Sequence, residues 1–151
     1  MELPKCGLYR TTATLGSVPA GRLVYFHNHG DPGPGVYLPK AWRHNRAEFD
    51  TQGHTLSDPS MATGLEPLSP EGFYQVVEAF HCCEKQCRRF EANALLQLGY
   101  NAEADPILFV PELVDSMLAI PAQGWKTGEA TIRNLRQLHV PVTKRDALPP
   151  Q

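Results

Sequence analysis

Alternation of apolar and polar positions marks the first third of the chain as strand-forming. The clearest segment is Arg22–His27, in which branched and aromatic residues follow a turn-forming Pro-Ala-Gly triplet. The Gly- and Pro-rich loop at residues 30–35 is incompatible with a helix and can join two strands as a hairpin. We therefore expect an antiparallel sheet or small β-barrel over residues 8–56. Its other strands are Leu8–Thr14, Val36–Leu38, which pairs with Arg22–His27, and residues 53–56.

Helical spacing of apolar residues dominates the segment after residue 69. Ser69 is a typical N-cap, Pro70 suits the first helical position, and Gly99 suits the position just after a helix. These boundaries predict one long helix over residues 70–98. The alternative is a helix that breaks near residues 88–91 and is followed by a strand over residues 92–100. The apolar stripe comprises Phe73, Val76, Val77, Phe80, Cys83, Cys87, Phe90, Ala94, Leu95 and Leu98.

The rest of the chain completes an α+β fold. The apolar run at residues 107–110 predicts a short buried strand, and a brief helix follows over residues 111–118. Thr127 caps a last helix with Ile132, Leu135 and Leu138 at helical spacing. We expect a single domain over residues 1–151, with a strand-rich part (1–58), a helix-rich part (69–142) and a flexible tail (143–151). No internal repeat is visible at any period.

Charge and composition narrow the class of protein. The chain has 16 acidic and 14 basic residues and is 42% hydrophobic, which is typical of a globular protein rather than a disordered one. Neither half has a net positive charge, which argues against a nucleic-acid partner. No charged leader precedes an apolar stretch, and no apolar run is long enough to span a membrane. We expect a soluble cytoplasmic protein with reduced cysteines.

Two histidines form the sharpest chemical pattern. On a strand, residues two apart point to the same side, so His27 and His29 can meet one divalent metal ion. With Gly21 six residues before His27, the pattern resembles the start of the first cupin motif. That resemblance implies a barrel with a catalytic metal, and hence a metal-dependent enzyme. Asp31 is the third candidate ligand, with His44 and His54 as possible substitutes.

The cysteines have a second possible role. Cys83 and Cys87 lie four residues apart, on one face of the expected helix, where two thiolates can hold a zinc ion. They also fall on the apolar stripe, where a cysteine packs as a small hydrophobic residue. We expect core packing, with metal binding and redox chemistry as alternatives, and Cys82 as the exposed thiol.

Aromatic residues around the expected hairpin indicate an interaction surface made of Tyr25, Tyr37 and Trp42. No catalytic constellation is evident, so we assign no catalytic residue and no cofactor. We expect a non-catalytic protein–protein interaction or assembly protein that binds a partner or a second copy of itself. The alternatives are the metal-dependent enzyme using His27 and His29 and, more weakly, a small-ligand binding domain.

Overall fold

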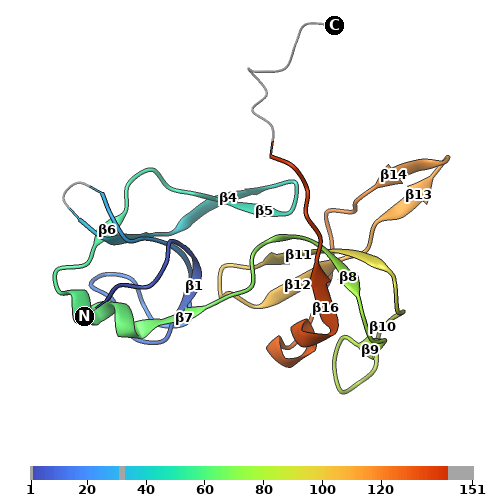
Figure 1. The fold of residues 1–151 in the computed structure, drawn as a ribbon, viewed down its shortest axis with the longest axis horizontal. Coiled ribbons are helices and arrows are strands. Elements are labelled where there is room, and N and C mark those ends of the chain that lie inside the picture. Colours follow the sequence, from blue (N-terminus) through green and yellow to red (C-terminus); the bar gives the residue numbers. More distant parts are fainter. Residues whose placement is uncertain (1, 31–32, 143–151) are drawn as a thin grey trace, which may run out of the picture.

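The computed structural model describes residues 2–30 and 33–142, and they form mainly β-structure (Figure 1). Strands hold 42% of the residues, and two short helices of 3₁₀ type hold 9%. The predicted α+β class, with its long helix and C-terminal helix, is therefore wrong. The predicted flexible tail, residues 143–151, lies outside the described residues.

The N-terminal half is a five-stranded antiparallel sheet in the order β6-β3-β2-β1-β7. A 3₁₀ helix, η1 (Pro59–Gly64), precedes the last strand and begins at Asp58, whose carboxylate accepts the Ser60 N–H at 3.0 Å. In chain order, β3 is followed by a hairpin of β4 (Pro39–Arg43) and β5 (Arg46–Phe49), which extends from this sheet before the chain returns to it as β6. The strands of the sheet are β1 (Gly7–Thr11), β2 (Leu23–His27), β3 (Gly35–Tyr37), β6 (His54–Thr55) and β7 (Leu65–Pro67).

The C-terminal half is a second five-stranded antiparallel sheet, in the order β15-β12-β11-β8-β16. Here too a 3₁₀ helix, η2 (Glu129–Asn134), precedes the last strand. The hairpin of β9 (Phe80–His81) and β10 (Arg89–Phe90) and that of β13 (Glu112–Val114) and β14 (Met117–Ala119) extend from it. The sheet contains β8 (Gly72–Val76), β11 (Leu95–Tyr100), β12 (Pro106–Phe109), β15 (Trp125–Lys126) and β16 (Leu135–Gln137).

The two halves repeat one arrangement, although the sequence shows no repeat. Strand order is the same, and so is the register: Gly7 pairs with Phe26 in the first half, and Gly72 pairs with Leu98 in the second. The hydroxyl of Tyr9 donates to the carbonyl oxygen four residues earlier at 2.7 Å, and Tyr74 does the same. By this register, residues 26 and 27 of the first half are equivalent to residues 98 and 99 of the second.

Each half has its own hydrophobic core, formed by alternate residues of its strands. In the first half Val24, Phe26 and Val36 are fully buried; in the second, Leu96, Leu98 and Leu108 are. Leu23 lies on β2 of the first half but packs in the hydrophobic core of the second half, so apolar packing continues from one half to the other.

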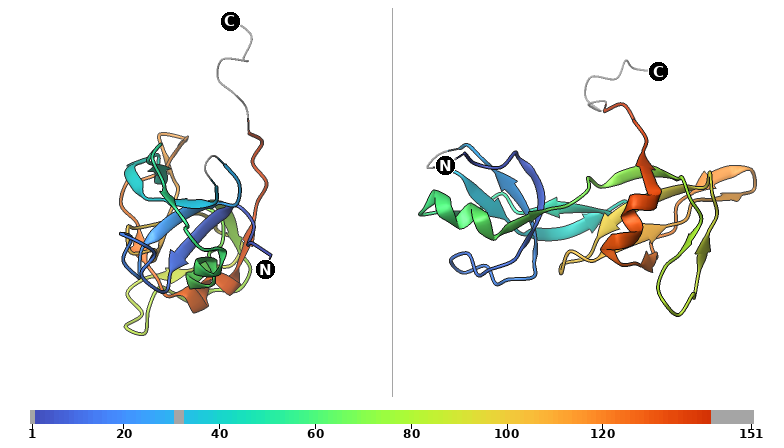
Figure 2. Two further views of the ribbon diagram at one scale, coloured as in Figure 1. Left: turned by 90° about the vertical axis from the view of Figure 1, so that its left-hand side faces the viewer. Right: turned by 60° about the horizontal axis from the view of Figure 1, so that its bottom comes forward.

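The β4–β5 hairpin reaches from the first half to the second, as the right-hand view in Figure 2 shows. The indole N–H of Trp42 donates to the carbonyl oxygen of Tyr100 at 2.8 Å. The turn residues His44 and Asn45 bond to the buried Gln97 side chain through two 3.0 Å hydrogen bonds. Gly99 lies directly below this turn, because a Cβ there would meet the Asn45 carbonyl oxygen at 2.6 Å. These contacts couple the halves, and the single domain over residues 1–151 stays a prediction.

In place of the predicted helix over residues 70–98, the structure has four strands, β8 to β11, and the turns between them. Within β8 the buried residues are Tyr74 and Val76, two apart, as expected for a strand rather than a helix. The chain reverses through the β9–β10 hairpin and a turn in which Asn93 has φ 69°, and it returns as β11. The alternative of a strand over residues 92–100 agrees with β11.

The later predicted helices are also wrong in part. The brief helix over residues 111–118 is the β13–β14 hairpin, whose turn residues Asp115 and Ser116 have φ 50° and 64°. The last helix is only the six residues of η2, after which Leu135–Gln137 continues as strand β16. The strand predicted at residues 107–110 corresponds to β12.

Candidate functional site

Cys6, His27 and His29 converge at the end of β2. His27 and His29 project on one side of the strand, with ring centroids 3.9 Å apart. Because Gly7 pairs with Phe26 in the antiparallel register, the preceding residue, Cys6, lies next to His27. The sulfur of Cys6 is 3.3 Å from Nδ1 of His27 and 3.9 Å from Nδ1 of His29. Three donor atoms of metal-ligand type therefore lie within 4.8 Å of one another.

Asn28 ties this cluster together. Its backbone N–H donates to the Cys6 sulfur at 3.3 Å, and its side-chain oxygen accepts from the same thiol at 3.2 Å. The same oxygen lies 2.8 Å from Nδ1 of His29, and the side-chain amide donates to the carbonyl oxygen of Pro4. Cys6 and His27 are half-buried and His29 is exposed, so an ion can enter from solvent.

The spacing fits a tetrahedral metal. With bond lengths of about 2.3 Å to sulfur and about 2.0 Å to imidazole nitrogen, tetrahedral geometry separates the two ligand atoms by about 3.6 Å. The two sulfur–nitrogen distances, 3.3 Å and 3.9 Å, lie on either side of that value. Three protein ligands from residues 2–30 and 33–142 leave one position open, which is typical of catalytic rather than structural zinc sites.

A cavity of about 450 Å³ begins beside Cys6, between that residue and the β4–β5 hairpin. Tyr25, Phe49 and Glu71 also line it. The Glu71 carboxylate accepts the Ala47 backbone N–H at 2.9 Å. Burial raises the pKa of this carboxyl, while the bond from Ala47 and the nearby Arg46 charge oppose the shift.

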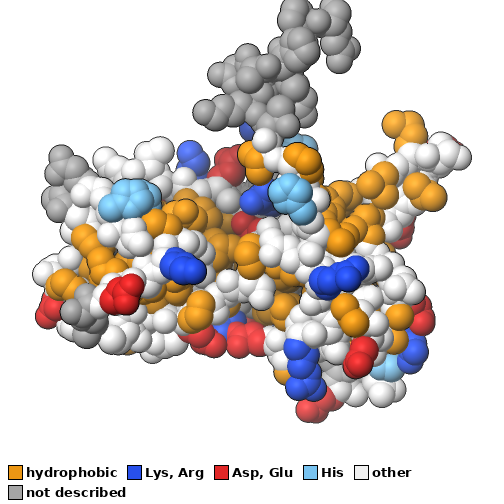
Figure 3. All heavy atoms as spheres, in the orientation of Figure 1, with side chains coloured by type: hydrophobic (Ala, Val, Ile, Leu, Met, Phe, Trp, Pro, Cys, Tyr) orange, Lys and Arg blue, Asp and Glu red, His pale blue; other side chains and the backbone are white. Residues whose placement is uncertain are grey.

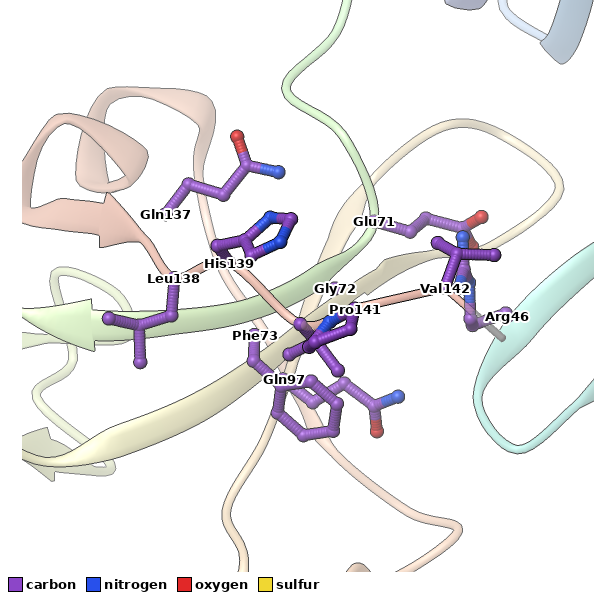
Figure 4. A pocket seen from close by; sticks show the side chains of 11 residues that line it. Arg46, Glu71, Gly72, Phe73, Gln97, Gln137, Leu138, His139, Pro141 and Val142 are labelled. Atoms are coloured by element: carbon purple, nitrogen blue, oxygen red, sulfur yellow. The ribbon is translucent and has the colours of Figure 1, made fainter.

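A larger cavity, of about 640 Å³, lies on the other side of Arg46 and Glu71 (Figure 4). The segment over residues 137–142 forms one wall, and β8 and Gln97 form the floor. Among residues 2–30 and 33–142 there is no long helix that could enclose a ligand pocket against a sheet. The small-ligand hypothesis itself stays a prediction.

Among the described residues, the other predicted metal ligands, His44 and His54, do not join the cluster. Asp31 lies outside the described residues. His54, on β6, is 3.1 Å from the Ser17 hydroxyl, and His44 is in the β4–β5 turn with φ 52°. Sequence reasoning missed Cys6, which is 21 residues from His27. The pairing of the segments at residues 8–14 and 22–27, extended by two residues before Leu8, is the signal that leads to it.

The remaining cysteines differ from prediction. Cys83 and Cys87, expected in the core, are exposed, and Cys82, expected to be exposed, is buried. All three lie at the β9–β10 loop and not on a helix. Hydrogen bonds from the Cys87 backbone N–H and the Cys82 thiol lower the pKa of the Cys83 thiol to about 7.

The predicted aromatic interaction surface is mostly engaged in packing. The ring centroids of Tyr25 and Phe49 are 5.7 Å apart. Tyr37 on β3 pairs with Tyr25 on β2, and its ring lies against Gly53. Trp42 is 42% exposed and bonds to the other half. Four exposed apolar side chains instead gather on the projecting β13–β14 hairpin (Figure 3), namely Leu113, Val114, Met117 and Leu118.

No family model, no curated protein and no solved structure matches this chain. Among residues 2–30 and 33–142, no helix has the length and apolar character needed to cross a membrane.

Proposed function

We propose that this protein binds a zinc-type divalent ion through Cys6, His27 and His29 and uses it as a metal-dependent enzyme. The convergence of a thiol and two imidazoles at metal-ligand spacing carries this proposal. The thiolate and imidazole donor set favours zinc or a similar transition metal over Mg²⁺ or Ca²⁺, which prefer oxygen ligands.

The open coordination position supports catalysis over a purely structural role. A zinc ion bound by three residues can hold a water molecule and lower its pKa towards neutrality, or polarise a carbonyl or phosphoryl oxygen. Cys6 also lines the cavity of about 450 Å³, where a small substrate can approach the ion. On the far side of that cavity the half-buried Glu71 is available as an acid–base group.

The test is metal content and coordination spectroscopy of purified protein. The test uses a Cys83→Ser, Cys87→Ser background, which removes the exposed thiols of the other cysteine cluster. This protein is expected to bind one Co²⁺ with the intense visible bands of a tetrahedral, sulfur-containing site. Adding Cys6→Ser is expected to remove the sulfur-to-cobalt bands, and adding His27→Ala is expected to abolish tetrahedral binding. His54→Ala is the matched control, because His54 lies on β6 outside the cluster. An octahedral spectrum in that background, or one that stays equally strong after His27→Ala is added, would contradict the proposal.

A second candidate is self-association through the β13–β14 hairpin. Leu113 and Met117 are 75% and 73% exposed, and apolar side chains this exposed along one projecting element are typical of interaction sites. Sedimentation velocity of wild type and of a Leu113→Ser, Met117→Ser variant tests it. Concentration-dependent dimers in wild type alone would support self-association, and monomers in both would exclude it.

A further inference from the structure

Three of the four cysteines gather at the β9–β10 loop, in the C-terminal half. The sulfurs of Cys82 and Cys83 are 3.5 Å apart, and those of Cys83 and Cys87 are 3.8 Å apart. All three sulfurs lie within 4.8 Å of one another. This cluster shares no residue with the cluster of Cys6, His27 and His29.

Contacts that do not involve the sulfurs fix the shape of this loop. The rings of Phe80 and Phe90 stack at 5.1 Å across the hairpin, and the Cys82 N–H donates to the Arg88 carbonyl oxygen at 2.9 Å. Within the loop the Gln86 N–H donates to the Cys83 carbonyl oxygen, with Gln86 at φ 55°. The three sulfurs are therefore held together before any ion binds, which lowers the ordering cost of binding.

Cys82 is the anchor of the cluster. Its side chain is 3% exposed, and its carbonyl oxygen accepts the Thr127 hydroxyl at 2.9 Å, which ties the loop to the segment that leads into η2. Cys83 and Cys87, by contrast, are exposed, so an ion can reach the cluster from solvent. One fixed ligand and two accessible ligands suit capture of an ion from solution.

The sulfur spacing fits a thiolate-bound metal. Two sulfurs on a tetrahedral zinc ion, at about 2.3 Å each, are about 3.8 Å apart. The distances of 3.5 Å and 3.8 Å agree with that separation. Three thiolates form a soft donor set, which selects Zn²⁺ and Cu⁺ over oxygen-preferring cations.

We propose that Cys82, Cys83 and Cys87 form a thiolate site for a thiophilic d¹⁰ metal ion, separate from the Cys6 cluster. Each thiol loses its proton to solvent as its sulfur binds the ion, and no oxidant or reductant takes part. With zinc, the fourth position is left for water. This site does not rest on the function proposed for Cys6, His27 and His29.

Cadmium titration under a phosphine reductant tests the proposal, because Cd²⁺ bound by thiolates absorbs strongly in the ultraviolet. Wild type is expected to bind two Cd²⁺ if both clusters are metal sites. Cys83→Ser, Cys87→Ser should lose one equivalent and most of the thiolate absorbance, because two of the three sulfurs are removed. Cys6→Ser, His27→Ala should lose the other equivalent and keep most of that absorbance, so failure of one site is distinguishable from failure of the other.

Protection of thiols in wild type gives a second measurement that needs no variant. Saturating Cd²⁺ should slow alkylation of Cys83 and Cys87 at least tenfold, as measured by peptide mass spectrometry. Arg88 lies 5.7 Å from the centroid of the Trp125 ring, so the same titration should also change Trp125 fluorescence. Equal alkylation rates with and without Cd²⁺, or unchanged Cd²⁺ stoichiometry in Cys83→Ser, Cys87→Ser, would overturn the proposal.

Discussion

Replacing Gly99 with alanine tests how tightly the β4–β5 hairpin docks on β11. The added Cβ would lie 2.6 Å from the Asn45 carbonyl oxygen and 3.2 Å from Cε2 of Phe109. The first neighbour is backbone and cannot rotate away. The hairpin turn would have to retreat by about 0.8 Å, the difference between 2.6 Å and the 3.4 Å at which ordinary contact begins.

The expected loss of stability is about 2–4 kcal/mol. Overpacking of this kind costs about 1–3 kcal/mol. Displacing the turn also strains the two hydrogen bonds between it and Gln97, each worth about 1 kcal/mol. Against this, alanine restricts the unfolded chain and returns about 0.4–1 kcal/mol.

Urea unfolding followed by tryptophan fluorescence measures the effect, since Trp42 is in the displaced hairpin and Trp125 is in the C-terminal sheet. Gly128→Ala is the control, because Gly128 has φ −82° and a Cβ there would have no neighbour within 4 Å. Gly99→Ala and Gly128→Ala unfolding within about 0.5 kcal/mol of each other would show that the hairpin does not press on β11.

Three further predictions follow from single contacts. Tyr9→Phe and Tyr74→Phe should each cost about 1 kcal/mol of unfolding free energy, because both lose an equivalent 2.7 Å hydrogen bond; a loss in only one half would contradict the equivalence. Burial raises the pKa of Glu71, so the folded protein binds that proton more tightly than the unfolded chain. Stability should therefore fall as pH rises from the ordinary carboxyl pKa through the raised value, and this fall should be absent in Glu71→Gln. In urea unfolding, Thr127→Val should lose about 1–3 kcal/mol, because the Cys82 carbonyl and Thr131 hydroxyl lose their partner, whereas Thr127→Ser should stay close to wild type.

Local pattern was sufficient for four of the five strands of the first sheet, all except β7, and not for most of the second sheet. The strand predicted at Arg22–His27 is β2, and it pairs with β3 across the Gly/Pro loop as expected. There the turn residues are glycines and prolines, whose conformational preferences are strong. In the second half one turn uses Gln86 at positive φ, which this residue type does not signal, and a single Asn93 marks the turn before β11.

The predicted long helix shows why periodicity alone misleads. Residues 73, 76, 77 and 80 fit a helical stripe, yet Phe73 and Val76 lie on different faces of β8, and Val77 is 55% exposed. The density of aromatic and β-branched residues over 73–80 was the contrary signal. Strand pairing with β11 and β16, distant in sequence, then outweighed local helical preference.

The candidate site was predictable to the same limited extent. Alternation along a strand was enough to place His27 and His29 on one side. The third ligand depended on register, because Cys6 reaches His27 only through the pairing of β1 with β2. The cluster of Cys82, Cys83 and Cys87 in the β9–β10 loop was not predicted. A helix over residues 70–98 places Cys82 on a different face from Cys83 and Cys87, so the three thiols were not expected to meet.

The duplicated scaffold explains why only the first half carries the Cys6 cluster. By register, Cys6 and His27 are equivalent to Glu71 and Gly99. In the second half both positions hold the β4–β5 hairpin: the Glu71 carboxylate accepts the Ala47 N–H, and Gly99 leaves room for the Asn45 carbonyl. An imidazole at position 99 would displace the hairpin. Conversely, a hairpin docked on the first half in the same way would collide with His27, which agrees with the exposed position of β13–β14, the equivalent hairpin. The same two positions therefore hold candidate metal ligands, Cys6 and His27, in the first sheet. In the second sheet they hold Glu71 and Gly99, which pack against the β4–β5 hairpin.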